Sequence, residues 1–163
     1  MAGADRAATE ALGAALGLGP VAARVLYARG LRDPGEARRF LKPSLDDLHD
    51  PFLLRDMREA VARLRRAIDE RQKVLVYGDY DVDGTTSIVI LKKAIELAGG
   101  EASYHVPHRL KDGYGMREEA VERAAADGVS LIVSVDTGIR AADAVRRATS
   151  LGIDVIVTDH HLP

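Results

Sequence analysis

The feature that most constrains the fold is an alternation of short hydrophobic segments with helical patterns after about residue 72. The hydrophobic segments are rich in β-branched residues and have the length of buried strands, and glycines close the helical patterns between them. The expected strands are 74–77, 102–106, 131–135 and 153–158, and the expected helices are 85–98, 116–127 and 141–150. This alternation predicts an α/β fold with a parallel sheet flanked by helices.

Three of the four expected strands run directly into acidic residues, and the last of them adds two histidines. The side chains that follow these strands are Asp79, Asp81, Asp83, Asp136, Asp159, His160 and His161. Functional sites of parallel sheets lie at the carboxyl ends of the strands, so we expect these groups to converge. Crowded ionised carboxylates repel one another unless a positive charge compensates them. The sequence therefore predicts a divalent metal site, suited to hydrolysis of a phosphate ester.

Other readings of the acids after the first strand are weaker. The pattern D-x-D-x-D-G also begins a calcium loop of the EF-hand kind, but its twelfth position should be Glu and is Ile90 here. Asp81-Val82-Asp83-Gly84-Thr85 resembles the signature of haloacid dehalogenase-type phosphatases, in which the first Asp is a nucleophile. We find no convincing equivalent of the later Lys of that family. A purely structural role, in which Asp83 or Asp136 caps a helix, is the remaining alternative.

The first part of the chain has a different character. Pro and Gly residues punctuate short helical pieces up to about residue 54, which predicts a small N-terminal helical appendage (1–54) before the α/β domain (55–163). A helix is expected over 56–71 from the spacing of its apolar residues. Its other face carries arginines, which are either simply solvated or in contact with phosphates: Arg58, Arg63, Arg65, Arg66 and Arg71.

Composition narrows the class of protein. The 163 residues include no cysteine, which excludes disulfides, thiolate zinc sites and cysteine nucleophiles, and fits a reducing cytoplasm. The amino-terminal residues lack the pattern of a signal peptide, and the apolar stretch there is far shorter than a membrane span. We therefore predict a cytoplasmic protein without a membrane partner. The formal net charge of -2 favours no particular partner.

Four motifs together resemble those of a known family. They are VYGDYDVDG at 76–84, PHRLKDGYG at 107–115, SVDTG at 134–138 and VTDHHLP at 157–163. In kind, order and spacing they are similar to the motifs of the DHH phosphoesterase superfamily, and within it to the RecJ family of single-strand-specific 5′→3′ exonucleases. Residues 28–31 and 40–43 also resemble the leader of that family. The similarity covers nearly the whole chain.

The resemblance implies a role for each motif residue. The implied metal ligands are Asp79, Asp81, Asp83, Asp136 and His160, with Asp79 as either an additional ligand or a support. The implied catalytic residues are Asp136 and His161, and the implied substrate contacts are Arg109, Tyr114 and His161. His105 and His108 are expected to be structural.

The resemblance also implies an activity and its cofactors. We expect two divalent ions, Mn²⁺ or Mg²⁺, and hydrolysis of single-stranded DNA from its 5′ end in repair and recombination. The alternatives are a related phosphoesterase for small substrates, such as cyclic dinucleotides, oligonucleotides or pyrophosphate, and a non-catalytic binding unit. Members of the family continue with a further metal-binding Asp and a second domain. We therefore expect the chain to be an N-terminal fragment with an incomplete DHH domain, whose activity alone is uncertain.

Overall fold

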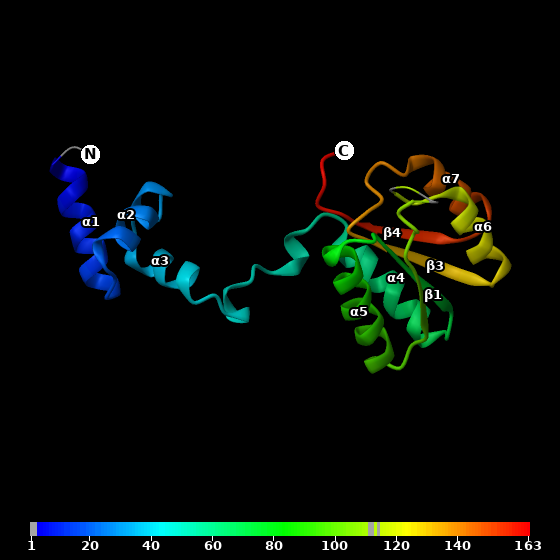
Figure 1. Cartoon of the computed structure of the whole chain (residues 1–163). Coiled ribbons are helices and arrows are strands. Elements are labelled where there is room, and N and C mark those ends of the chain that lie inside the picture. Colours follow the sequence, from blue (N-terminus) through cyan, green and yellow to red (C-terminus); the bar gives the residue numbers. More distant parts are fainter. Residues whose placement is uncertain (1–2, 111–112, 114) are drawn as a thin grey trace. The chain divides into compact units, whose positions relative to one another are not determined.

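The chain forms two compact units in a computed structural model that describes residues 3–110, 113 and 115–163. The units comprise Met1–Leu53 and Leu54–Pro163 (Figure 1). Helices precede the sheet along the chain, as the predicted appendage requires.

The first unit consists of short helices around a small apolar core. Its elements are α1 (Gly3–Leu16), α2 (Pro20–Ala28), α3 (Pro34–Leu41) and the 3₁₀ turns η1 (Leu45–Asp47) and η2 (Pro51–Leu53). Leu12, Leu26 and Ala37 form the core, one from each α-helix. Within the described residues, no single helix has the length and apolar character to cross a membrane. Two consecutive helical segments, Asp5–Leu16 and Pro20–Ala28, meet those criteria only jointly and are bent by 114°.

The second unit is built on a four-stranded parallel sheet. Its strands are β1 (Lys73–Gly78), β2 (Ala102–His105), β3 (Val129–Val135) and β4 (Asp154–Thr158), arranged in the order β2-β1-β3-β4. Its helices are α4 (Met57–Asp69), α5 (Val82–Leu97), α6 (Glu118–Ala126) and α7 (Ala142–Ser150). The predicted α/β fold with a parallel sheet flanked by helices is confirmed.

Helices cover both faces of this sheet, with α4 and α5 on one side and α6 and α7 on the other (Figure 1). Alternation along the strands divides the core in the same way, because successive side chains of a strand point to opposite faces. In β1, Val74 and Val76 pack with Ile88 and Ile95 of α5, whereas Leu75 belongs to the cluster beneath α6 and α7. Burial on both faces explains why the central strands β1 and β3 read as nearly continuous apolar runs.

One helix begins earlier than its sequence pattern predicts. We expected the helix after β1 to start at residue 85, but α5 starts at Val82. The side chain of Asp81 accepts a hydrogen bond from the backbone N–H of Gly84 and so caps the helix. The helix therefore begins three residues ahead of the expected start. Asp83 consequently lies in the first turn of α5 and does not cap it.

Candidate active site

The candidate site lies where β1, β3 and β4 end. The register pairs Gly78 with Val135 and Val135 with Thr158, so all three strands reach the same edge of the sheet at their last residues. Asp79, Asp136 and Asp159 are the next residue of each strand in turn. The sheet thus brings together acids that are separated by up to 80 positions, counted from 79 to 159.

Three carboxylates form the centre of the site. Asp79, Asp81 and Asp136 each place an oxygen within 4.8 Å of the others. Asp79 and Asp136 are buried, with exposed fractions of 3% and 7%. Oδ1 of Asp79 and Oδ2 of Asp136 are buried and accept no hydrogen bond from the described residues. Because buried polar atoms are almost always satisfied in native proteins, these oxygens fit a site that binds a cation.

The backbone of Asp136 is held in a special conformation. Its φ of 59° lies in the left-handed region, which non-glycine residues seldom adopt but Asp and Asn tolerate. Its N–H donates to the carbonyl oxygen of Thr158, at 2.9 Å, which ties β3 to β4 at this point. Asp136 does not cap the following helix, because α7 begins at Ala142 without a side-chain cap. The strained backbone, therefore, directs the carboxylate into the acidic cluster.

The acids of the cluster influence one another electrostatically. Burial and the nearby charge of Asp81 raise the pKa of Asp136 above its ordinary value. The pKa of Asp81 is lowered, chiefly by the hydrogen bond that its carboxylate accepts from Gly84. Asp136 is thus the member of the pair that ionises at a free-energy cost. A cation placed between the two would remove that cost.

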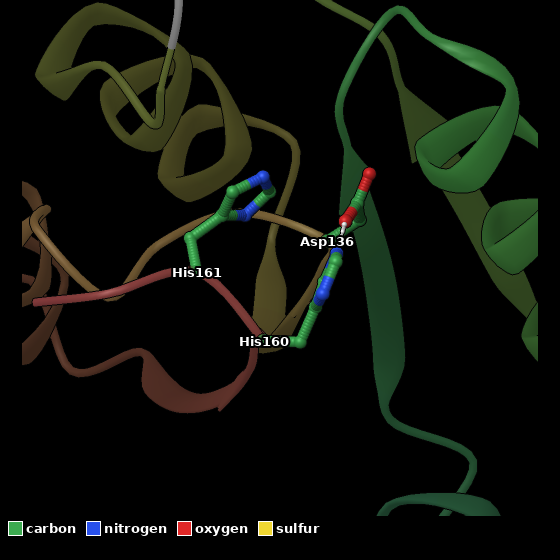
Figure 2. Close-up of side chains that lie close together, drawn as sticks. All are labelled: Asp136, His160 and His161. Atoms are coloured by element: carbon green, nitrogen blue, oxygen red, sulfur yellow. Dashed lines mark hydrogen bonds and ion pairs between the residues drawn. The ribbon is translucent and has the colours of Figure 1, made fainter. Parts of the chain in front are cut away.

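The two histidines after β4 make different contacts, as expected from adjacent residues. Nε2 of His160 lies 2.9 Å from Oδ1 of Asp136, and Figure 2 shows its imidazole against that carboxylate. The ring of His161 is tilted against that of His160, with 4.6 Å between the ring centroids. Nδ1 of His161 lies 2.7 Å from Oδ1 of Asp159. This contact raises the pKa of His161. Asp136, His160 and His161 can also offer ligand atoms within 4.8 Å of one another.

Three other predicted site residues have different outcomes. Asp83 is exposed and belongs to neither group of potential ligands in the described part of the chain, so its ligand role stays a prediction. The guanidinium of Arg109 lies over the ring of Tyr80, 5.1 Å from the ring centroid, which places it beside the loop that carries Asp79 and Asp81. Tyr114 lies outside the described residues.

Two residues near the site make contacts for which the sequence predicted no individual role. Tyr80 contacts Arg109, and Asp159 bonds to His161. Tyr80 stands between two predicted ligands and Asp159 begins the histidine motif, so their motif positions were the available signal. A pattern of residue types does not show which of them are turned inward.

A cleft adjoins the histidines and leaves room for a substrate. It has a volume of about 840 Å³ and is lined in part by Arg117, Thr137, Arg140 and His161. Gly138 also lines it, and its φ of 116° is one that a side chain rarely adopts. A Cβ at Gly138 would lie 2.6 Å from Oγ of Ser134, so only glycine fits here without displacement.

The donor set fits a hard divalent cation. Carboxylate oxygens predominate, and His160 contributes one imidazole. This set of donors suits Mn²⁺ or Mg²⁺ better than it suits metals that prefer thiolate ligands. The orphaned oxygens of Asp79 and Asp136 point to the same conclusion, since both are buried next to another acid. The site residues present are therefore compatible with the expected metal.

Comparison with known protein families identifies the family of the chain. The profile of the DHH family, N-terminal domain, matches residues 73–163, which is more than half of the chain and contains every strand of the sheet. The chain belongs to the DHH family. The expectation drawn from the four motifs is thereby confirmed.

Individual relatives extend the similarity to the first unit. The chain is 38% identical to the single-stranded-DNA-specific exonuclease RecJ of Bacillus subtilis over 159 residues, or 98% of this chain and 20% of that protein. It is 42% identical to RecJ of Escherichia coli over 148 residues, or 90% of this chain and 25% of that protein. The chain thus spans between a fifth and a quarter of the length of these relatives.

A solved structure of a relative has a similar fold. RecJ from Thermus thermophilus in complex with Mn²⁺ superimposes with a TM-score of 0.75 and 32% identity, covering 96% of this chain and 21% of the other. The same protein has also been solved with Mg²⁺, with a TM-score of 0.61. Metal binding in those structures is a property of the relatives, and it makes the acidic cluster of this DHH chain the natural place to test for it.

Proposed function

We propose that the chain supplies the metal-binding part of a phosphodiesterase that degrades single-stranded DNA from its 5′ end. The observation that carries the proposal is the convergence of Asp79, Asp81 and Asp136 with His160, including two buried carboxylate oxygens that lack a donor in the described structure. The names of the RecJ relatives support the substrate. A role in DNA repair and recombination is part of the same proposal.

The residues of the site have separate tasks in this proposal. Asp79, Asp81, Asp136 and His160 would hold Mn²⁺ or Mg²⁺, which when bound activates water and stabilises the departing oxygen. Asp83 remains a further proposed ligand. None of these carboxylates is required as a covalent nucleophile, which distinguishes the proposal from a haloacid dehalogenase-type mechanism.

His161 is proposed to contact the phosphate that is cleaved. Its hydrogen bond to Asp159 raises the pKa of the imidazole, which favours the protonated form of the ring. A protonated ring can donate from Nε2 to a phosphate oxygen or to the leaving oxygen. Arg109 adds a guanidinium beside the same loop, where it would bind the phosphate or the terminal nucleotide. Tyr114 is proposed as a neighbouring substrate contact.

A hybrid protein tests the proposal in the context that it requires. The chain would replace the aligned fifth of Bacillus subtilis RecJ, and 5′-labelled single-stranded DNA would be incubated with the hybrid and Mn²⁺. We expect release of labelled mononucleotides, little action on blunt duplex DNA, and a loss of about 10³-fold or more on Asp136→Asn substitution, the scale on which single electrostatic groups act. Asp143→Asn, on the exposed surface of α7, serves as the matched control.

Each other outcome of this experiment has a meaning. A hybrid that is folded and binds Mn²⁺ but hydrolyses only a dinucleotide or pyrophosphate would favour the small-substrate phosphoesterase. Mn²⁺ binding without hydrolysis of any of these substrates would refute the catalytic proposal in favour of a binding unit. An Asp136→Asn hybrid that retains full activity would show that the metal site has been assigned to the wrong residues.

A further inference from the structure

Asp159 is a buried carboxylate beside two exposed histidines. Its side chain is 1% exposed, whereas the side chains of His160 and His161 are 71% and 44% exposed. A buried acid needs hydrogen-bond donors to remain ionised. The hydrogen-bond donors around Asp159 therefore indicate its role.

Both oxygens of Asp159 accept hydrogen bonds from backbone or ring N–H groups. Oδ1 accepts from the backbone N–H of His161 at 3.0 Å and lies 2.7 Å from Nδ1 of the same residue. Oδ2 accepts from the backbone N–H of Ile139 at 3.0 Å. The carboxylate is thus an acceptor for all three contacts.

The contacts of Asp159 indicate which nitrogen of His161 carries hydrogen. Both carboxylate oxygens already accept from backbone N–H groups, so the short contact at Nδ1 is made by an N–H on that ring atom. The second bond, to the backbone N–H of the same residue, fixes the ring relative to its own main chain. A substrate phosphate must then be met by Nε2, which lies at the other side of the ring.

We propose that Asp159 is a positioning residue that accepts from the Nδ1–H of His161 and orients its imidazole, so that Nε2 faces the substrate phosphate and donates to it when the ring is protonated. This rests on the proposed phosphate contact of His161. Carboxylates that do not touch the metal orient metal-bound histidines in the same manner, by accepting from the ring nitrogen remote from the metal. Here the oriented ring is the one assigned to the substrate.

The competing explanation is that Asp159 only anchors the loop between β3 and α7. Its bond to the N–H of Ile139 does tie that loop to the end of β4. Loop anchoring predicts a loss of stability on substitution but no specific effect on the ring of His161. The two explanations therefore differ in whether substitution of Asp159 changes the hydrogen position on His161. They also differ in whether the effects of substituting Asp159 and His161 are coupled.

Nitrogen-15 NMR of the histidine rings in the metal-free chain measures the hydrogen position directly. At a pH at which the ring carries a single hydrogen, we expect the Nδ1–H form at His161 in the wild type and its loss in Asp159→Ala, with the resonance identified through His161→Ala. Thr158→Val is the matched control, because it removes a hydrogen bond to the carbonyl oxygen of Ser134 at the same strand end without touching His161. A wild-type ring in the Nε2–H form, or one that Asp159→Ala leaves unchanged, would overturn the proposal.

A double-mutant cycle measures the functional coupling. Calorimetric titration with thymidine 5′-monophosphate in the presence of Mn²⁺ would compare Asp159→Ala, His161→Ala and the double variant. We expect each single variant to bind about tenfold more weakly, and the double variant to bind no more weakly than His161→Ala. Independent, multiplicative losses would support loop anchoring and refute positioning.

The two readouts separate this inference from the proposed function. Failure of the wild type to bind the nucleotide would contradict the proposed phosphate contact of His161. The NMR result would still decide whether Asp159 orients the ring. Thermal unfolding of each variant, with Thr158→Val as reference, identifies any Asp159→Ala protein that has lost its fold, and Asp159→Asn then replaces it because it keeps one acceptor oxygen.

Discussion

Without metal, the Asp136→Asn variant is expected to unfold at a higher temperature than the wild type. The carboxylate of Asp136 is buried beside Asp81, and the raised pKa shows that its charged form is disfavoured in the fold. A group with a raised folded-state pKa costs stability once the pH exceeds that pKa, so at neutral pH a neutral amide removes a cost. Asn also tolerates the φ of 59° at this position.

The expected increase in melting temperature is several degrees. A change of about 1 kcal/mol in the free energy of unfolding shifts the melting temperature of a domain of this size by roughly 4 °C. Mn²⁺ should reverse the order of the two melting temperatures, so that the wild type unfolds at the higher temperature. At 100 times its dissociation constant a ligand stabilises by about 2.7 kcal/mol, which the wild type should gain and Asp136→Asn should lose.

Thermal scans with and without Mn²⁺ measure both effects. Asp143→Asn is the control, since Asp143 is exposed in α7 and pairs with Arg146 away from the site. It should show no increase without metal and a full response to Mn²⁺. An Asp136→Asn protein that is stabilised by Mn²⁺ as strongly as the wild type would exclude Asp136 as a ligand.

The Gly84→Ala variant is expected to lose both stability and metal affinity. A Cβ at this position would lie 2.5 Å from the carbonyl oxygen and 2.6 Å from the nitrogen of Asp79, which are backbone atoms that cannot rotate away. Overpacking of this kind costs typically 1–3 kcal/mol, and we expect the upper part of that range. The forced shift also moves Asp79 and the capping bond from Gly84 to Asp81, so Mn²⁺ affinity should fall at least tenfold.

Denaturant unfolding and Mn²⁺ titration test this expectation together. Gly19→Ala is the matched control, because no heavy atom lies within 4 Å of a Cβ at Gly19 and its φ of -66° suits alanine. Its stability should change by less than about 1 kcal/mol. If Gly84→Ala were as stable as Gly19→Ala and bound Mn²⁺ normally, the close approach of α5 to the end of β1 would not support the site as described.

The fold was predictable because its signals are local and repeated. Apolar runs that end in acids indicated β1, β3 and β4, and the short helical patterns between them indicated a parallel sheet. The start of α5 was missed by three residues, because its N-cap is Asp81, a residue that the sequence pattern assigned to the metal site alone. One carboxylate can cap a helix with one oxygen and face the cluster with the other.

The site was less predictable than the fold because side-chain direction depends on contacts that a sequence does not contain. Asp136 joins the cluster through a left-handed backbone conformation, and Asp159 is turned inward to bond to Ile139 and His161. Asp83, from the same motif as Asp81, lies exposed in the first turn of α5. Periodicity placed all four acids at one edge of the sheet and left open how each is oriented.

The most direct test of the metal site is a crystal structure of the chain grown with Mn²⁺, with anomalous scattering measured at the manganese absorption edge. We expect an anomalous peak within coordination distance of Asp81 and Asp136, with His160 contacting bound metal and no longer only the carboxylate of Asp136. Crystals that hold millimolar Mn²⁺ but show no anomalous density at Asp136, or show it only elsewhere on the chain, would contradict it.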